Sequence, residues 1–171
     1  MEQSLKRSII LEHYQNPKNK CLLNDDSYEK INMNNESCID EINLEIKYEN
    51  GIIKDIHFDG EACAICTSST SIMIETLIGK TLDEAKEIYI NFEKMLNEED
   101  YNADILESSI VYEDISKQPN RKKCTLLPRL CNTYRDYAGF GIRHYNGQVL
   151  PRKCLRRFKG IKGFVRSFPA G

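Results

Sequence analysis

The sequence lacks the features that mark membrane-spanning, secreted or fibrous proteins. No run of apolar residues approaches the roughly 18 that a transmembrane helix needs, and the N-terminal segment lacks the apolar stretch of a secretory signal peptide. There is no tryptophan, no internal repeat and no low-complexity tract. These absences exclude collagen-like, mucin-like and coiled-coil proteins. We therefore expect a cytoplasmic protein with no membrane segment.

The composition that is present is that of a globular protein, but it is divided unevenly along the chain. Of the 171 residues, 40% are hydrophobic and 29% are charged. Residues 1–127 contain 14 Lys and Arg against 25 Asp and Glu, whereas residues 128–171 contain 10 against one. We predict one folded domain over residues 1–127 and a basic C-terminal segment of different character over residues 128–171.

The first part of the chain predicts a short helix followed by irregular chain. Apolar residues at helical spacing favour a helix over residues 4–14, with Ser4 as its N-cap and Pro17 shortly after its end. Residues 18–37 are polar and show no clear period, so they are predicted to be irregular.

Strict alternation of apolar and polar residues then predicts a β-hairpin. Its strands cover residues 42–48 and 52–58. Asn50 and Gly51 between them are typical of a type I′ turn.

The hairpin is followed by a pattern of helical period. It predicts a helix over residues 64–78 and a second helix over residues 81–96, whose start is marked by a capping box of Thr81 and Glu84. The acidic residues 97–120 are predicted to form a loop with at most one helical turn. These elements together indicate an α+β fold with a small antiparallel sheet.

Seven cysteines are many for a chain in a reducing compartment, and three of them lie where the predicted structure changes. Cys38 precedes the hairpin, Cys63 follows it, and Cys124 begins the last periodic segment. Because the hairpin carries the chain out and back, Cys38 and Cys63 are predicted to meet at one edge of the sheet, with Asp40 beside them. Three thiolates and a carboxylate suit tetrahedral Zn²⁺, and cysteine ligation also suits an iron–sulfur cluster. The spacing alone still favours three small buried residues, because it matches no compact metal motif.

The remaining cysteines and histidines have simpler explanations. Cys63 and Cys66 are spaced like a redox pair, but such pairs occur in a βαβ unit and these follow a hairpin. Cys66 is therefore predicted to be a helix-face residue or a spare thiol. His13 and His57 fall within helix and strand patterns, so we expect them to pack. The other cysteines are interpreted as structural or incidental: Cys21, Cys131 and Cys154.

The motifs around Cys38, Cys63 and Cys124 closely resemble, in the same order, those of the NifU/IscU-like iron–sulfur cluster assembly scaffolds. The resemblance covers residues 4–127. The segments that carry it are residues 10–20 (ILEHYQNPKNK), 34–40 (NNESCID), 58–69 (FDGEACAICTSS) and 121–127 (RKKCTLL).

Two features resemble the zinc-binding SufU-type branch of that family. They are the long acidic stretch before the third cysteine, and Lys123 where the IscU branch usually has a histidine. The resemblance implies an α+β fold of about three antiparallel strands packed with helices. It also implies that Zn²⁺, or a transient [2Fe–2S] cluster, is held by Cys38, Asp40, Cys63 and Cys124.

The role implied by the resemblance is that of a scaffold or sulfur carrier rather than a conventional enzyme. Persulfide sulfur would come from a cysteine desulfurase, whose histidine replaces one cysteine on the zinc, and iron–sulfur apo-proteins would be downstream partners. We take Cys38 as the sulfur acceptor because Asp40 can tether its loop, with Cys124 as the alternative. Cys124 is expected at a helix N-terminus, which favours a thiolate, and the basic residues 121–123 would offset the negative charge of the site.

The chain departs from this family at several points. Ile39 and Ala62 stand where glycine is common beside the first two cysteines, which restricts the backbone there. After Leu127 the resemblance ends. The basic segment, residues 128–171, carries no recognised motif. Nucleic-acid binding is therefore less favoured for it than an unusual terminal extension or a shifted reading frame. The alternative function is a binding module in which a structural Zn²⁺ holds the fold and the basic segment contacts an acidic partner.

Overall fold

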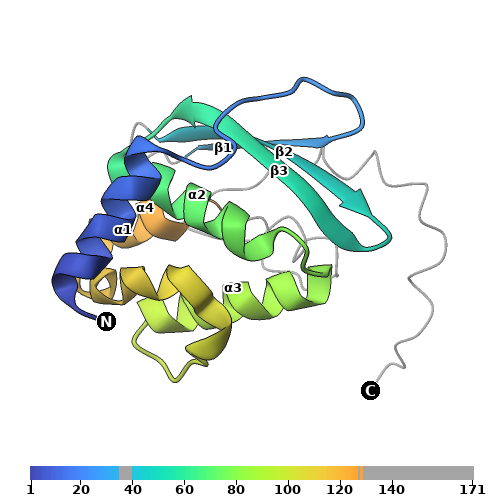
Figure 1. The fold of residues 1–171 in the computed structure, drawn as a ribbon. Coiled ribbons are helices and arrows are strands. Elements are labelled where there is room, and N and C mark those ends of the chain that lie inside the picture. Colours follow the sequence, from blue (N-terminus) through green and yellow to red (C-terminus); the bar gives the residue numbers. More distant parts are fainter. Residues whose placement is uncertain (35–39, 127, 129–171) are drawn as a thin grey trace, which may run out of the picture. The chain divides into compact units, whose positions relative to one another are not determined.

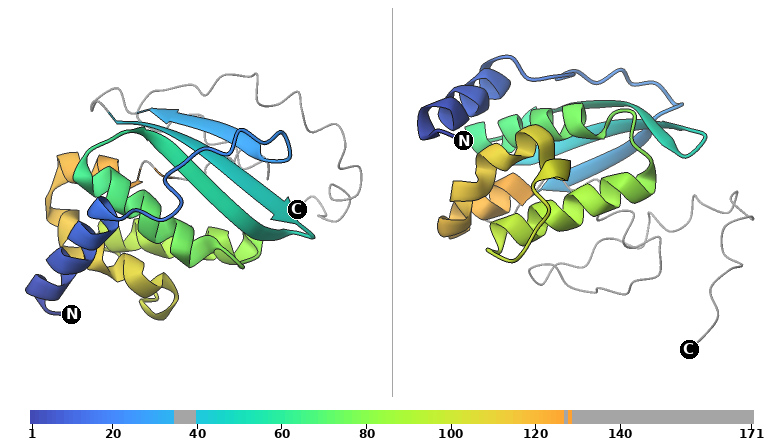
Figure 2. Two further views of the ribbon diagram at one scale, coloured as in Figure 1. Left: turned by 45° about the horizontal axis from the view of Figure 1, so that its top comes forward. Right: turned by 60° about the horizontal axis from the view of Figure 1, so that its bottom comes forward.

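The computed structural model describes residues 1–34, 40–126 and 128. Within them, an antiparallel sheet of three strands is covered on one face by helices (Figures 1 and 2). The elements follow the order α1 (Gln3–Gln15), β1 (Glu29–Asn34), β2 (Glu41–Glu49), β3 (Ile52–Glu61), α2 (Ala64–Leu77), α3 (Leu82–Leu96), the 3₁₀ helix η1 (Asp104–Lys117) and α4 (Pro119–Leu126). The α+β fold predicted from the sequence is confirmed. No helix among these residues is long and apolar enough to cross a membrane.

The β2–β3 hairpin forms as predicted. Asn50 and Gly51 have φ values of 53° and 78°, which a type I′ turn requires at both central positions. Alternate side chains of both strands point toward the helices and are almost fully buried: Ile42, Leu44, Ile46, Ile56 and Phe58. Glu41 at the start of β2 and Glu61 at the end of β3 are therefore paired at the same end of the sheet.

Helix α2 lies between the sheet and the other helices, and its composition reflects this position. Its 14 residues include one charged side chain, Glu75, and its serines and threonines are buried. Several hydroxyls donate hydrogen bonds to backbone carbonyls one turn earlier: Thr70 donates to Cys66 O and Thr76 to Ile72 O. The small side chains let neighbouring helices approach, and Ser69 Oγ donates to Thr125 O of α4 at 2.8 Å.

Helix α3 begins as its sequence predicts. Thr81 Oγ1 accepts the Glu84 N–H, while the Glu84 carboxylate accepts the Thr81 N–H, so the capping box is present. Its buried side chains are those expected from the period: Ala85, Ile88, Met95 and Leu96.

Three predictions about local structure were wrong. Residues 29–34, predicted to be irregular, form the edge strand β1, where Ile31 and Met33 pair across from Leu44 and Ile42. The acidic loop contains η1, a 3₁₀ helix that turns sharply at Glu107, where φ is 48°. Ser4 does not cap α1, because the helix starts at Gln3 and the Ser4 hydroxyl instead bonds the Glu2 carboxylate.

Helix α1 is tied to the helical layer by a buried cation. Lys6 is 6% exposed, and its ammonium donates to Asp114 Oδ2 at 2.8 Å and to the Glu113 carboxylate. Both acids lie on η1. The predicted basic segment, residues 128–171, lies outside the described residues except for Pro128.

Candidate metal centre

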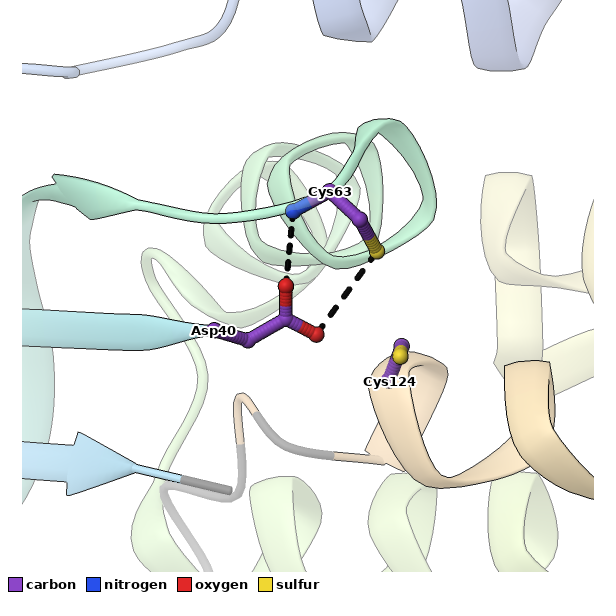
Figure 3. Close-up of side chains that lie close together, drawn as sticks. All are labelled: Asp40, Cys63 and Cys124. Atoms are coloured by element: carbon purple, nitrogen blue, oxygen red, sulfur yellow. Dashed lines mark hydrogen bonds between the residues drawn. The ribbon is translucent and has the colours of Figure 1, made fainter. Parts of the chain in front are cut away.

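Asp40 is the residue immediately before β2, and it is buried although it carries no ion-pair partner among the described residues. Its side chain is turned toward the end of β3, where the chain leaves the sheet for α2 (Figure 3). Oδ1 accepts the backbone N–H of Cys63 at 2.7 Å, and Oδ2 lies 3.6 Å from Cys63 Sγ. A buried carboxylate that accepts a backbone N–H avoids much of the cost of desolvation.

Cys63 occupies the N-cap position of α2. Its backbone is extended, with φ −66° and ψ 163°, and its sulfur accepts the N–H of Cys66 at 3.4 Å. The residue is exposed at the start of the helix, so its sulfur can be reached from solvent. The position at a helix N-terminus that was predicted for Cys124 is thus the position of Cys63.

Cys124 lies in the last turn of α4, so its predicted place at a helix N-terminus was wrong. The helix begins five residues earlier, at Pro119, a residue that favours the first helical position. Cys124 is 4% exposed, and its thiol donates to Asn120 O at 3.7 Å. Its side chain faces Asp40 and Cys63 from the opposite side of the site (Figure 3).

The structure thus brings together three of the four predicted ligands. One ligand atom each from Asp40, Cys63 and Cys124 lies within 4.8 Å of the others. Donors on a tetrahedral zinc ion, with bonds of 2.0–2.3 Å, are about 3.5 to 3.8 Å apart. Side-chain movements of about 1 Å would therefore place all three on one ion, and the two soft sulfurs suit zinc or iron. The fourth predicted ligand, Cys38, lies outside the described residues.

A close backbone approach holds the two strand ends at the site. Gly60 of β3 has a φ of 141°, and a Cβ atom there would lie 2.1 Å from Glu41 O. A residue with a side chain cannot replace Gly60, which lies three positions before Cys63. This residue was not singled out from the sequence, although Gly60 stands in the motif around the second cysteine.

The structure also locates Cys66 and His13, which were predicted to pack rather than to bind a metal. Cys66 is fully buried in the core, where it faces away from solvent as a helix-face residue. Ser68, on the same helix as Cys66, accepts the hydroxyl of buried Tyr112 at 2.8 Å, and burial raises the pKa of this phenol. His13 packs against α2 through Ser71 Oγ at 2.8 Å.

The fold and this cluster define a class of protein: a small α+β domain with one carboxyl group and two cysteines, at one end of its sheet, that could together hold a metal ion. Residues 5–125 match the family described as the NifU-like N terminal domain. The chain belongs to that family, as the motifs around its cysteines indicated.

The relatives include scaffold proteins and a sulfur-transfer protein. The zinc-dependent sulfurtransferase SufU of Bacillus subtilis is 36% identical over 125 residues, which cover 72% of this chain and 84% of the relative. The iron–sulfur cluster assembly scaffold protein IscU of Thermotoga maritima is 38% identical over 93 residues, covering 54% and 66%.

Solved structures support the same fold. The putative iron–sulfur cluster assembly scaffold protein for the SUF system from Fervidobacterium islandicum has a TM-score of 0.65 and 35% identity, over 70% of this chain and 88% of that one. The N-terminal part of a NifU-like protein from Brucella abortus has the same TM-score at 22% identity, over 74% and 90%, a likeness of fold alone.

Proposed function

We propose that this protein serves in iron–sulfur cluster assembly by accepting persulfide sulfur from a cysteine desulfurase. One observation carries the proposal. In a chain 36% identical to a zinc-dependent sulfurtransferase, Asp40, Cys63 and Cys124 converge to within 4.8 Å although 84 positions separate the first from the last.

Four residues would hold the metal: Cys38, Asp40, Cys63 and Cys124. Bound Zn²⁺, or a [2Fe–2S] cluster, would keep the cysteines deprotonated and ready to react. Asp40 orients Cys63 by accepting its N–H, and Cys63 caps the first turn of α2.

Sulfur uptake requires a thiolate that the donor can reach. The thiolate attacks the outer sulfur of the desulfurase persulfide, a new S–S bond forms, and the old S–S bond breaks to release the desulfurase thiol. Cys124, the alternative acceptor, is only 4% exposed and would need local opening. This burial argues against Cys124 as the acceptor, so we keep Cys38 in that role and assign Cys124 as a ligand from the protein interior.

The test uses metal content and desulfurase turnover together. Cys38→Ala, Cys63→Ser, Cys124→Ser and Asp40→Asn are expected to lower the zinc content of purified protein sharply. Cys21→Ser, at an exposed cysteine away from the site, is expected to leave it unchanged. The full chain should also raise alanine formation by a cysteine desulfurase, and Cys38→Ala should remove that increase.

Two results would contradict the proposal. Zinc loss in Cys21→Ser equal to that in Cys63→Ser would show that the ligands are wrongly assigned. Wild-type protein that binds zinc but never stimulates the desulfurase would indicate a structural metal, particularly if the zinc leaves only when the protein unfolds.

A further inference from the structure

A second cysteine site lies on the face of the sheet that is turned away from the helices. The connection between α1 and β1, residues 16–28, runs beside the free edge of β3 and then across the sheet face turned away from the helices (Figure 1). Phe58 N–H donates to Asn19 O at 3.0 Å, and the buried Glu45 carboxylate accepts the backbone N–H groups of Leu23 and Asn24. The chain on both sides of Cys21 is therefore held against the sheet.

This connection places Cys21 on an imidazole. Cys21 Sγ lies 3.4 Å from Nδ1 of His57, and Nε2 of the same ring lies 2.9 Å from Asp55 Oδ2. The simplest proton arrangement has the Nε2–H donating to Asp55, which leaves Nδ1 to accept the thiol proton. Thiol, imidazole and carboxylate thus form one hydrogen-bonded line.

The carboxylate end of this line is firmly fixed. Asp55 also accepts the Tyr28 hydroxyl at 2.7 Å, the Asn19 amide at 3.3 Å and the Ile56 N–H at 3.0 Å. Partial burial alone would raise its pKa, but the bonds from Tyr28 and His57 outweigh burial and leave the pKa of Asp55 below its usual value. The bond to Asp55 raises the pKa of Tyr28 to about 12, so this hydroxyl remains a donor at neutral pH.

Of the three groups, the thiol is the most exposed, as a nucleophile that meets a reagent from solvent must be. The imidazole is 13% exposed and the Asp55 side chain 32%, whereas Cys21 is exposed to solvent. Other groups that face the imidazole are Glu45, paired with His57 across β2 and β3, and the Tyr28 ring, above which Lys47 lies at 5.7 Å.

We propose that Cys21, His57 and Asp55 form a second reactive thiol site, in which His57 activates Cys21 as a nucleophile toward the outer sulfur of low-molecular-weight persulfides. The thiol and the carboxylate bond opposite nitrogens of one ring, so their donor atoms do not converge on a point as those of the metal centre do. This geometry suits proton transfer rather than metal binding. The site goes beyond the proposed function, because it needs neither the metal nor a desulfurase.

The reaction is balanced without an external oxidant. Cys21 passes its proton to His57, and the thiolate attacks the outer sulfur of the persulfide R–S–SH. The new S–S bond on Cys21 forms as the R–S bond to that sulfur breaks. His57 then returns the proton to the departing thiolate, which leaves R–SH and a persulfide on Cys21.

The first test is the alkylation rate of Cys21. The full chain is treated briefly with iodoacetamide at pH 7, and the modified cysteines are quantified by peptide mass spectrometry. Loss of the imidazole in His57→Gln should slow the alkylation of Cys21 about tenfold, because no base then lies beside the thiol to take its proton. His13→Gln, the matched change at the other described histidine, should have no effect. Cys66 is fully buried, so its alkylation stays low only while the protein is folded, and in the same samples it reports whether the fold is intact.

The second test is sulfur transfer itself. With glutathione persulfide as the donor, the Cys21 peptide should gain one sulfur atom in wild type and in Cys38→Ala, but not in His57→Gln. A Cys21 rate unaffected by His57→Gln, or a fast thiol that gains no sulfur, would overturn the proposal. Loss of the reaction in Cys38→Ala would show that the site depends on the metal centre and is not a second site.

Discussion

Gly60 is the residue at which the geometry of the metal centre is most sensitive to a single added atom. It opposes Ile42 in the hairpin, one step from the strand ends that carry Asp40 and Cys63. Both the close approach of Glu41 O and the positive φ exclude a side chain there. Asp40, by contrast, could change to asparagine and still accept the Cys63 N–H, because only its charge would be lost.

Gly60→Ala is therefore expected to destabilise the protein more than the same change at Gly51. Gly51 also has a positive φ, but no atom lies within 4 Å of the position of its missing Cβ. We expect a loss of about 1 kcal/mol at Gly51, from backbone strain alone, and of at least about 2 kcal/mol at Gly60. Urea denaturation of metal-free protein measures both. Equal losses would mean that the strand ends can separate freely.

Among the elements, α1 and η1 are joined by Lys6, Glu113 and Asp114, and this cluster has a defined pH range. Hydrogen bonds to Asp114 and Glu113 raise the pKa of Lys6 above 10.5, and the bond from Lys6 lowers the pKa of Asp114 below 3.8. A lowered acid pKa stabilises the fold above its usual value, and a raised lysine pKa does so below its usual value. The contribution is thus complete between about pH 4 and pH 10.

Lys6→Met is expected to cost about 1 kcal/mol within that range, since the two carboxylates are 36% and 44% exposed and solvent weakens the pairs. The difference from wild type should shrink below pH 4 and above pH 10.5. Chemical denaturation across the pH range measures it. Arg7→Met, at an exposed neighbour that bonds the neutral Gln3, is the control. A constant difference at every pH would mean that Lys6 acts through packing alone.

The elements that the sequence predicted correctly are those whose pattern is local. The hairpin shows alternation with Asn50 and Gly51, and α3 shows a complete capping box. Strand β1 was missed because only Ile31 and Met33 alternate within a polar stretch. The 3₁₀ helix has no 3.6-residue period, and Glu107 interrupts it with a non-helical backbone whose φ is 48°.

At the scale of the whole molecule, two sites differ in how far the sequence could predict them. Asp40 and Cys63 lie at the two ends of one hairpin, so their meeting follows from the strand pattern. The contact of Cys21 with His57 depends on the path of residues 16–28 across the sheet. That path is set by buried Glu45, whose role no local pattern predicts.

The division of the chain near residue 128 leads to a prediction about truncation. Pro128 is buried and lines a small apolar cavity with side chains of α2, α3 and α4. A chain that ends at Gly141 is expected to keep its metal and its melting temperature. A chain that ends at Leu127 should melt about 5 °C lower, because apolar surface around this cavity becomes exposed, and should still carry Asp40, Cys63 and Cys124.

Thermal unfolding and zinc analysis of the two truncated chains distinguish the possibilities. Loss of zinc from the chain that ends at Gly141 would make residues 142–171 part of the metal centre. An unchanged melting temperature for the shorter chain would show that Pro128 contributes little to the core.

Because Cys63 caps α2 with its own sulfur, one backbone hydrogen is linked to the chemical state of the metal centre. The amide of Cys66 bonds that sulfur. If the sulfur turned toward a bound ion, this bond would weaken and the first turn of α2 would open more often. Deuterium uptake at this single amide would then follow loading in real time. This measurement does not depend on visible absorption, which a Zn²⁺ site lacks.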